Sequence, residues 1–245
     1  MNSNNIEIKK GTAAWRDLFY DNDTEAFWGP DFRTDTLYAK GDLSALLDLE
    51  RPKILFAGTR EIGDEERTLI HRIVHEIAQN PAKPVIVSGL AIGTDTAAHE
   101  AALNAGLPTV AVLPNGLDTV YPFANKRLAE AISTTPGCAL LTQFPERTVP
   151  EAINFLARNK TMAMISDIAI IPFTRLKGSA MMTAKLMSDR CRRVIAIPGK
   201  PFETLSEGCN ELILSGTAEI FTTRYTIQFL KELYVMRKSS EYFDQ

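Results

Sequence analysis

The sequence predicts an α/β protein built on a doubly wound, mostly parallel sheet in a single main domain. Short aliphatic and β-branched runs recur along the chain without polar alternation, as strands do when both faces of their sheet are covered. Amphipathic helical stretches lie between these runs, and the connections are short. Strands and helices that alternate in this way favour a parallel sheet with helices on both faces.

The aliphatic runs predict buried strands at 53–57, 84–87, 109–113, 139–142, 167–172 and 194–197. Helices are predicted at 64–79, 94–105, 125–133, 150–165 and 179–189. Over 64–79 one helical stripe holds the apolar side chains of Leu69, Ile70, Ile73, Val74 and Ile77. A short helical stretch is expected near 42–49, and a final helix over 225–238 is expected to dock on a partner.

Charge and composition divide the chain unevenly. Residues 1–50 hold ten acidic and five basic residues among scattered aromatic ones, which is typical of an arm that packs on a larger domain. We therefore predict an N-terminal arm (1–50), a main domain (51–223) and a C-terminal helical tail (224–245). The three cysteines have no metal-ligand spacing, and Cys138 and Cys191 are expected to be small core residues. With no signal peptide and no apolar run that could span a membrane, a cytoplasmic location is expected.

A basic segment stands out in a chain whose net charge is −3. Residues 155–200 hold nine lysines and arginines against two acidic residues. A local excess of this size suggests a surface that binds a polyanion, and a solvated helix surface is an equally good explanation.

Glycine-containing loops follow the predicted strands. In doubly wound sheets ligands bind beyond the carboxyl ends of the strands, so the loops at 58–60, 88–91, 115–118, 177–179 and 198–200 matter most. Glycines let backbone N–H groups converge, and the helix N-termini behind them favour negative charge. The expected ligand is a phosphate, of a nucleotide or of a nucleic acid.

The sequence argues against several other chemistries. GTREIG at 58–63 places Arg60 where a dinucleotide-binding loop needs its middle glycine, and no phosphate-binding P-loop is present, so no cofactor is expected. Asp95 and His99 are spaced as an acid–base pair but lack a nucleophile, and they are expected to brace the second loop. His71 and His75 lack the carboxylate of a zinc motif. We predict a protein that is not an enzyme.

Several motifs in sequence order resemble the DprA/Smf DNA-processing family over about residues 38–220. They are AGTRE, SGLAIGTDTAAHEAAL, LPNGLDTVYPFAN, FLARNKTMAMIS, KGSAMMTAKLM, VIAIPG and EGCNELILSGTAE. The resemblance implies an extended Rossmann-like domain that binds single-stranded DNA, forms a homodimer and hands the strand to a RecA-type recombinase during natural transformation.

The loops and the resemblance together nominate the residues that would contact DNA. From the first two loops they are Gly58, Thr59, Arg60, Ser88, Gly89, Leu90, Ala91 and Asp95. From the later helices they are Arg158, Asn159, Lys160, Lys177, Gly178, Ser179 and Thr183, with Ser179 as an expected N-cap. Tyr121 and Phe123 are expected either to stack on bases or to be structural aromatic residues.

The chain departs from the family pattern at the second loop. Ile92 stands where the family has an arginine that lines the DNA pocket, and Gln143 replaces a family glutamate. Two alternatives therefore remain open. One is a nucleotide-sensing or nucleoside-phosphate-binding protein of the related lysine-decarboxylase-like fold, although the motif P-G-G-x-G-T-x-x-E of that group is missing. The other is a partner-binding scaffold that has lost DNA binding.

Overall fold

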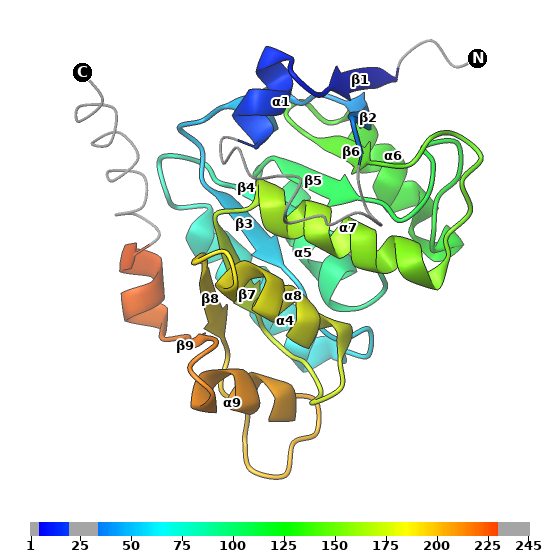
Figure 1. Ribbon diagram of the computed structural model, residues 1–245. Coiled ribbons are helices and arrows are strands. Elements are labelled where there is room, and N and C mark those ends of the chain that lie inside the picture. The colour runs from blue at the N-terminus through cyan, green and yellow to red at the C-terminus, as the bar shows by residue number, and fades with distance from the viewer. Residues whose placement is uncertain (1–4, 20–33, 230–245) are drawn as a thin grey trace.

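The computed structural model describes residues 5–19 and 34–229, and these contain a nine-stranded sheet with the order β1-β2-β6-β5-β4-β3-β7-β8-β9 (Figure 1). The strands are β1 (Ile6–Lys9), β2 (Thr36–Gly41), β3 (Lys53–Phe56), β4 (Val85–Ser88), β5 (Thr109–Val112), β6 (Ala139–Thr142), β7 (Ile168–Ile171), β8 (Arg193–Ala196) and β9 (Glu219–Ile220). Strands β3 to β9 are parallel to one another. The predicted fold class is confirmed.

Every residue of β3 to β7 is buried, which explains why these strands show no polar alternation. Each side of the sheet packs against a different set of helices. In β3, Leu55 belongs to the core on one face, and Ile54 and Phe56 belong to the core on the other. All six predicted strands are present, with ends that differ from the prediction by one residue at most positions.

Five longer helices cover the sheet and match the predicted ones. They are α4 (Asp64–Ile77), α5 (Thr94–Asn104), α6 (Lys126–Thr134), α7 (Ala152–Ile165) and α8 (Ser179–Ser188). In Figure 1, α7 and α8 lie in front of the sheet and α4 lies behind it. The shorter helices are α1 (Ala13–Leu18), α3 (Ser44–Leu47), α9 (Glu207–Leu214) and the 3-10 turn η2 (Phe123–Asn125).

The direction in which the sheet grows reverses at β3. Strands β4, β5 and β6 follow one another on one side of β3, and β7 and β8 follow on its other side. The loops after β3 and β4 therefore lead to helices on one face of the sheet, α4 and α5, and the loop after β7 leads to α8 on the other face. This is the position at which open α/β sheets form a ligand crevice.

Two strands that the sequence did not predict extend one edge of the sheet. β2 pairs antiparallel with β6, placing Tyr38 opposite Thr142, and β1 pairs antiparallel with β2. In β2 the side chains of Leu37 and Ala39 are buried and their neighbours are more exposed, so a period of two is present in the sequence.

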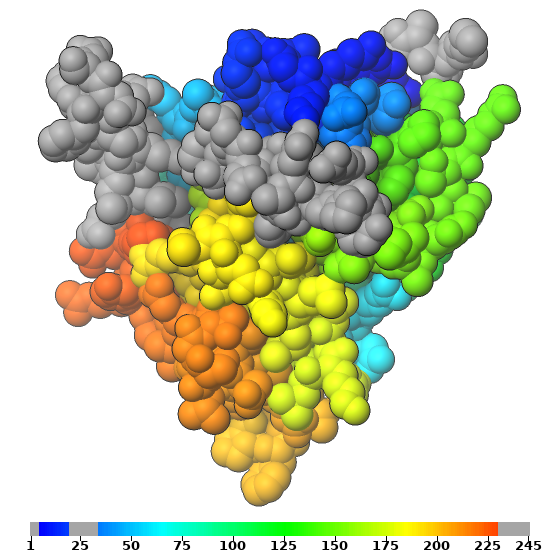
Figure 2. Space-filling view, in the orientation of Figure 1, coloured from blue at the N-terminus to red at the C-terminus, as the bar shows by residue number. Residues whose placement is uncertain are grey.

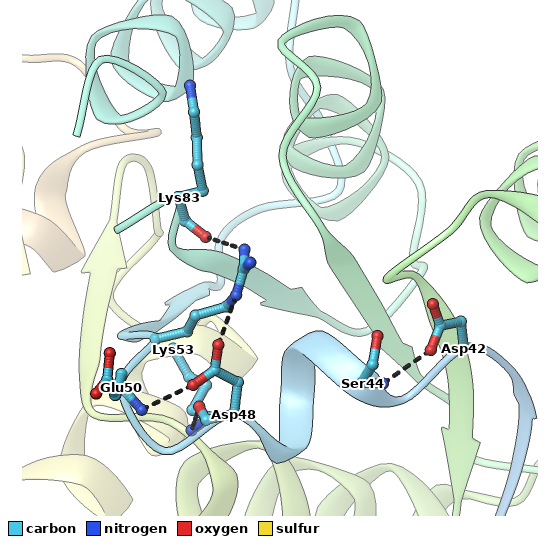
Figure 3. A network of polar contacts seen from close by, with 7 residues as sticks. Asp42, Ser44, Asp48, Glu50, Lys53 and Lys83 are labelled. Atoms are coloured by element: carbon cyan, nitrogen blue, oxygen red, sulfur yellow. Dashed lines mark hydrogen bonds and ion pairs between the residues drawn. The ribbon is translucent and has the colours of Figure 1, made fainter. Parts of the chain in front are cut away.

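The connection from β2 to β3 is tied down by polar contacts at the amino edge of the sheet (Figure 3). Asp42 accepts hydrogen bonds from the backbone N–H groups of Ser44 (2.9 Å) and Gly137 (2.7 Å), which lower the pKa of its carboxyl group. Asp48 accepts hydrogen bonds from Arg51 Nε and from the backbone N–H of Glu50, both at 3.0 Å. The bond to Gly137 fixes the end of β2 to the turn between α6 and β6, and the bonds to Asp48 close a local turn before β3.

The C-terminal part is described as far as residue 229, and 223–229 are helical. The guanidinium of Arg193 forms an ion pair with Glu219 and lies 3.4 Å from the centroid of the Phe229 ring. The remainder of the predicted helix over 225–238 lies outside the described residues. Within the described part of the chain, none of the helices combines the length and apolarity that crossing a membrane requires.

The cysteine predictions are half right. Cys138 is fully buried, and its Sγ accepts a hydrogen bond from the backbone N–H of Thr109 at 3.3 Å. Cys191 is exposed, because it occupies the turn between α8 and β8 with a φ of 55°. The prediction that Cys191 belongs to the core is therefore wrong.

Candidate functional site

Two adjoining pockets open at the carboxyl ends of β3 and β4, where the direction of the sheet reverses. Arg60, Ala91 and Arg158 line both of them. The first, of about 50 Å³, is completed by Gly89, Ile92, Pro114, Tyr121, Pro122 and Phe155. The second, of about 30 Å³, is completed by Ala57, Gly58, Asp95, Asn159, Met162, Ser179, Ala180 and Thr183.

The structure brings together most of the predicted site residues. Those that line the pockets are Gly58, Arg60, Gly89, Ala91, Asp95, Arg158, Asn159, Ser179 and Thr183. Those that line neither pocket are Thr59, Ser88, Leu90, Lys160, Lys177 and Gly178. Residues from four separate segments of the sequence thus converge on one place.

Arg60 supplies an exposed cation to both pockets. The neighbouring carboxylate of Glu61 does not neutralise it, because Glu61 pairs with Arg175, at 2.6 Å. Among the described residues Arg60 makes no ion pair, and its guanidinium carbon lies 5.7 Å from the centroid of the Phe155 ring. An exposed guanidinium beside an aromatic ring is well placed to meet an anionic ligand.

Arg158 does not have the exposed position that a simple phosphate contact requires. Only 5% of the residue is accessible, and its Nη1 donates hydrogen bonds to the backbone oxygens of Gly89 (2.5 Å) and Val112 (3.3 Å). Burial lowers the pKa of this guanidinium, and the nearby Asp95 opposes that effect. Arg158 therefore joins the loop after β4 to β5 and contributes charge from the wall of the pocket.

The sequence suggested that the backbone N–H groups of the glycine loop after β4 would bind a phosphate. In the structure these groups are already occupied. The backbone N–H groups of Gly89 and Ala91 both donate to Asp95 Oδ2, at 3.2 Å. Asp95 thus braces this loop, which confirms the structural role expected for it. His99 does not share that role, because it is fully buried and its Nδ1 lies 2.7 Å from Thr109 Oγ1 on β5.

The glycines of the first two loops allow the loops to touch each other. Gly93 has a φ of 84°, and a Cβ there would lie 2.5 Å from the backbone oxygen of Arg60. A Cβ at Gly58 would lie 2.4 Å from Thr94 Oγ1. Thr94 in turn donates to the backbone oxygen of Thr59 from both its N–H and its hydroxyl. The close approach that these glycines permit is therefore between loops.

The side chains of three predicted residues make contacts within the protein and do not line the pockets. Ser88 is buried, and its hydroxyl donates to the backbone oxygen of Phe56 at 2.7 Å. The side chain of Leu90 is buried in the core beneath α6, and its backbone has a φ of 62°. Thr59 accepts a hydrogen bond from the backbone N–H of Glu61 through its hydroxyl, at 3.2 Å. These residues shape the loops and do not face the pockets.

The start of α8 differs from the prediction by one residue. Gly178 is the N-cap and Ser179 is the first helical residue, so the N-cap role predicted for Ser179 is wrong. Ser179 still reaches the second pocket, and the buried Thr183 lies one turn farther along the same helix. Lys177 is exposed immediately before this helix.

An aromatic wall, not anticipated in full from the sequence, completes the first pocket. The rings of Tyr121 and Phe155 meet edge to face, with centroids 5.8 Å apart. Phe155 was missed, although its place three residues before Arg158 puts both on one helix face, and the guanidinium carbon of Arg158 lies 5.7 Å from its ring centroid. Phe123 lines neither pocket and is highly exposed.

The basic segment at 155–200 does not form one surface. The crossover helix α8 runs from the carboxyl edge of the sheet back to its amino edge, so Arg190, Arg192 and Arg193 lie at the edge opposite the pockets. Arg192 is occupied with the backbone oxygens of Ala163, Met164 and Ser166. The excess of positive charge along the sequence therefore overstates the charge near the site.

The pockets combine two guanidinium groups with aromatic and aliphatic side chains. Such a site can hold an anionic group next to a planar ring. In the ranges 5–19 and 34–229, no group of three or more His, Cys, Asp or Glu side chains is placed to hold a metal ion.

Comparison with known proteins identifies the family. The family profile described as DNA recombination-mediator protein A matches residues 30–231. The chain belongs to this family. The DNA processing protein DprA of Streptococcus pneumoniae is 34% identical over 180 residues, which are 74% of this chain and 61% of that protein. The DNA processing protein DprA of Bacillus subtilis is 31% identical over 196 residues, which are 80% of this chain and 64% of that protein.

Solved structures of DprA share the fold. The X-ray structure of DprA from Streptococcus pneumoniae has a TM-score of 0.71 at 34% identity and covers 77% of this chain and 64% of that chain. A structure of DprA from Helicobacter pylori, which concerns its single-stranded DNA binding mode, has a TM-score of 0.76 at 28% identity. It covers 93% of this chain and 96% of that chain. The molybdenum cofactor binding protein of Rippkaea orientalis, at 15% identity and a TM-score of 0.53, shares the fold alone.

The comparisons confirm the DprA/Smf resemblance and the Rossmann-like fold. The chain spans less than two thirds of the length of the first two DprA relatives described above.

Proposed function

We propose that the pockets at the carboxyl edge bind single-stranded DNA. The observation that carries this proposal is the exposed guanidinium of Arg60 beside the rings of Tyr121 and Phe155 in one small pocket. A cation and an aromatic wall side by side match a phosphate and its neighbouring base. A base can enter such a pocket only when it is unstacked and unpaired, which favours single strands over duplexes.

The names of the relatives support a proposal for the wider role. The relatives are DNA processing proteins, and DprA from Helicobacter pylori is described as binding single-stranded DNA. We propose that this protein protects incoming single strands in the cytoplasm and loads a RecA-type recombinase onto them during DNA uptake. We also propose that it acts as a homodimer and is not an enzyme. The arm, main domain and tail at 1–50, 51–223 and 224–245 remain our proposed division of the chain.

Titration of labelled oligo-dT and of a duplex of the same length, at low and moderate salt, tests the proposal. We expect the single strand to bind more tightly, with an affinity that falls as salt rises, because phosphate contacts release counterions. Equal affinity for the two forms, or no binding at low salt, would contradict it. If a single thymidine nucleotide competed as strongly as oligo-dT, the site would instead belong to a nucleotide sensor.

Replacing Ile92 with arginine is expected to tighten binding of oligo-dT. Ile92 is 53% exposed and lines the same pocket as Arg60, so a guanidinium there would add a cation without burying it. The salt dependence should steepen by about 0.7 in log K against log salt for the one added phosphate contact. The measurement is the salt titration above, repeated on the variant. An unchanged slope would mean that the strand does not pass over this loop.

A further inference from the structure

The loop at 198–206, between β8 and α9, exposes an aromatic side chain in an unusual conformation. Phe202 is fully exposed, at 101%. Its φ is 66°, in the left-handed region that residues with a side chain rarely adopt. Backbone strain of this kind occurs most often where a residue serves in binding or catalysis.

Hydrogen bonds fix the turn that carries Phe202. The carboxylate of Glu203 accepts from the backbone N–H of Lys200 (3.2 Å) and from the hydroxyl of Ser206 (3.1 Å). The side chain of Asn210 on α9 accepts from the backbone N–H of Gly199 at 2.9 Å. Phe202 is therefore held outward by a braced turn.

This turn belongs to the same edge of the sheet as the pockets. Strands β3, β7 and β8 are neighbours, so the loop after β8 begins two strand spacings, about 10 Å, from the start of the loop that carries Arg60, and it projects outward from there. The loop before α8 lies between them and contacts α9, because the backbone N–H of Gly208 donates to Thr174 at 2.8 Å. In Figure 2 the loop at 198–206 forms the projecting tip at the lower end of the molecule.

We propose that Phe202 stacks on a base of the single strand that leaves the pocket, and that Lys177 and Lys200 contact the flanking phosphates. The inference rests on the proposed function and extends its site beyond the pockets. Lys177 and Lys200 are both exposed, one in the intervening loop and one in the turn itself. An exposed ring between two lysines complements the alternation of bases and phosphates along a strand.

Length dependence tests the inference. Phe202→Ala is compared with the unmodified protein on oligo-dT of about 4 and about 16 nucleotides, the range of known single-strand sites. We expect about a tenfold loss of affinity for the longer strand, consistent with one lost stacking contact, and no change for the shorter one. Phe202→Tyr should retain the affinity because it keeps the ring. Leu214→Ala removes another highly exposed apolar side chain, at the end of α9, and should bind as the unmodified protein does.

The outcomes separate this inference from the proposed function. Unchanged binding of the longer strand by Phe202→Ala would overturn the inference alone. An equal loss on both lengths would also overturn it, since the effect would then arise in the pocket. Failure of the unmodified protein to bind either length would overturn the proposed function and the inference together.

Discussion

Alanine at Arg60 is expected to reduce the affinity for oligo-dT by about tenfold to a hundredfold. Arg60 is the exposed guanidinium of both pockets, and a hydrogen bond to a charged group contributes about 1.5–3 kcal/mol. Loss of one phosphate contact should also reduce the slope of log K against log salt by about 0.7. Both quantities come from fluorescence anisotropy titrations at several salt concentrations.

Arg72→Ala is a matched control for Arg60→Ala. Arg72 is an exposed arginine of α4 that lines neither pocket. Its replacement removes the same charge from the protein and should leave both the affinity and the salt dependence nearly unchanged. If the two variants lost equal affinity, the long-range field of the protein, and not a contact at the pocket, would explain binding. The thermal midpoint of Arg60→Ala should stay close to that of the unmodified protein, because the side chain is exposed.

Alanine at Arg158 is expected to destabilise the fold by about 3–5 kcal/mol, the usual result of leaving a buried charge without its partner. The variant removes the hydrogen bonds to Gly89 and Val112 and leaves the buried carboxylate of Asp95 without its neighbouring cation. For a chain of this size the thermal midpoint should fall by roughly 2–4 °C per kcal/mol. Differential scanning calorimetry or thermal circular dichroism measures the shift.

A double-mutant cycle separates the buried charge from the lost packing. If Asp95 and Arg158 stabilise each other, Asp95→Ala together with Arg158→Ala should cost less than the sum of the single variants. Additive losses would show that Arg158 acts through its hydrogen bonds to the backbone alone. A stable Arg158→Ala protein that failed to bind DNA would contradict this structural assignment and favour direct contact with the strand.

Much of the architecture could be predicted from the sequence, because buried strands and helices have recognisable patterns of apolar residues. Strands such as β3 and β7 are covered on both faces, so continuous aliphatic runs mark them. β2 was missed because its alternation lies within an acidic, polar segment, and only Leu37 and Ala39 are buried. α9 was missed although Cys209 and Leu212 form part of a helical stripe, because Gly208 in its first turn is unfavourable to a helix.

The pocket could be predicted only in part, because the sequence shows which residues are charged but not which of them are buried. Arg60 and Arg158 look alike in a sequence, but one is exposed and the other is surrounded by backbone oxygens of β5 and the loop after β4. Similarly, a glycine that lets a ligand approach cannot be distinguished from one that lets a second loop approach. Gly93 is of the second kind, and its partner, the backbone of Arg60, is more than thirty residues away in the chain.

The mutual contact of the first two loops has a consequence for the kinetics and thermodynamics of binding. Thr94 donates two hydrogen bonds to the backbone oxygen of Thr59, and Gly93 packs against the backbone of Arg60, before any ligand arrives. The loss of conformational freedom on complex formation then falls on the flexible strand and little of it falls on the protein. Encounter should be limited by diffusion and charge, without a slow closing step, and the amide protons of these loops should exchange at similar rates with and without DNA.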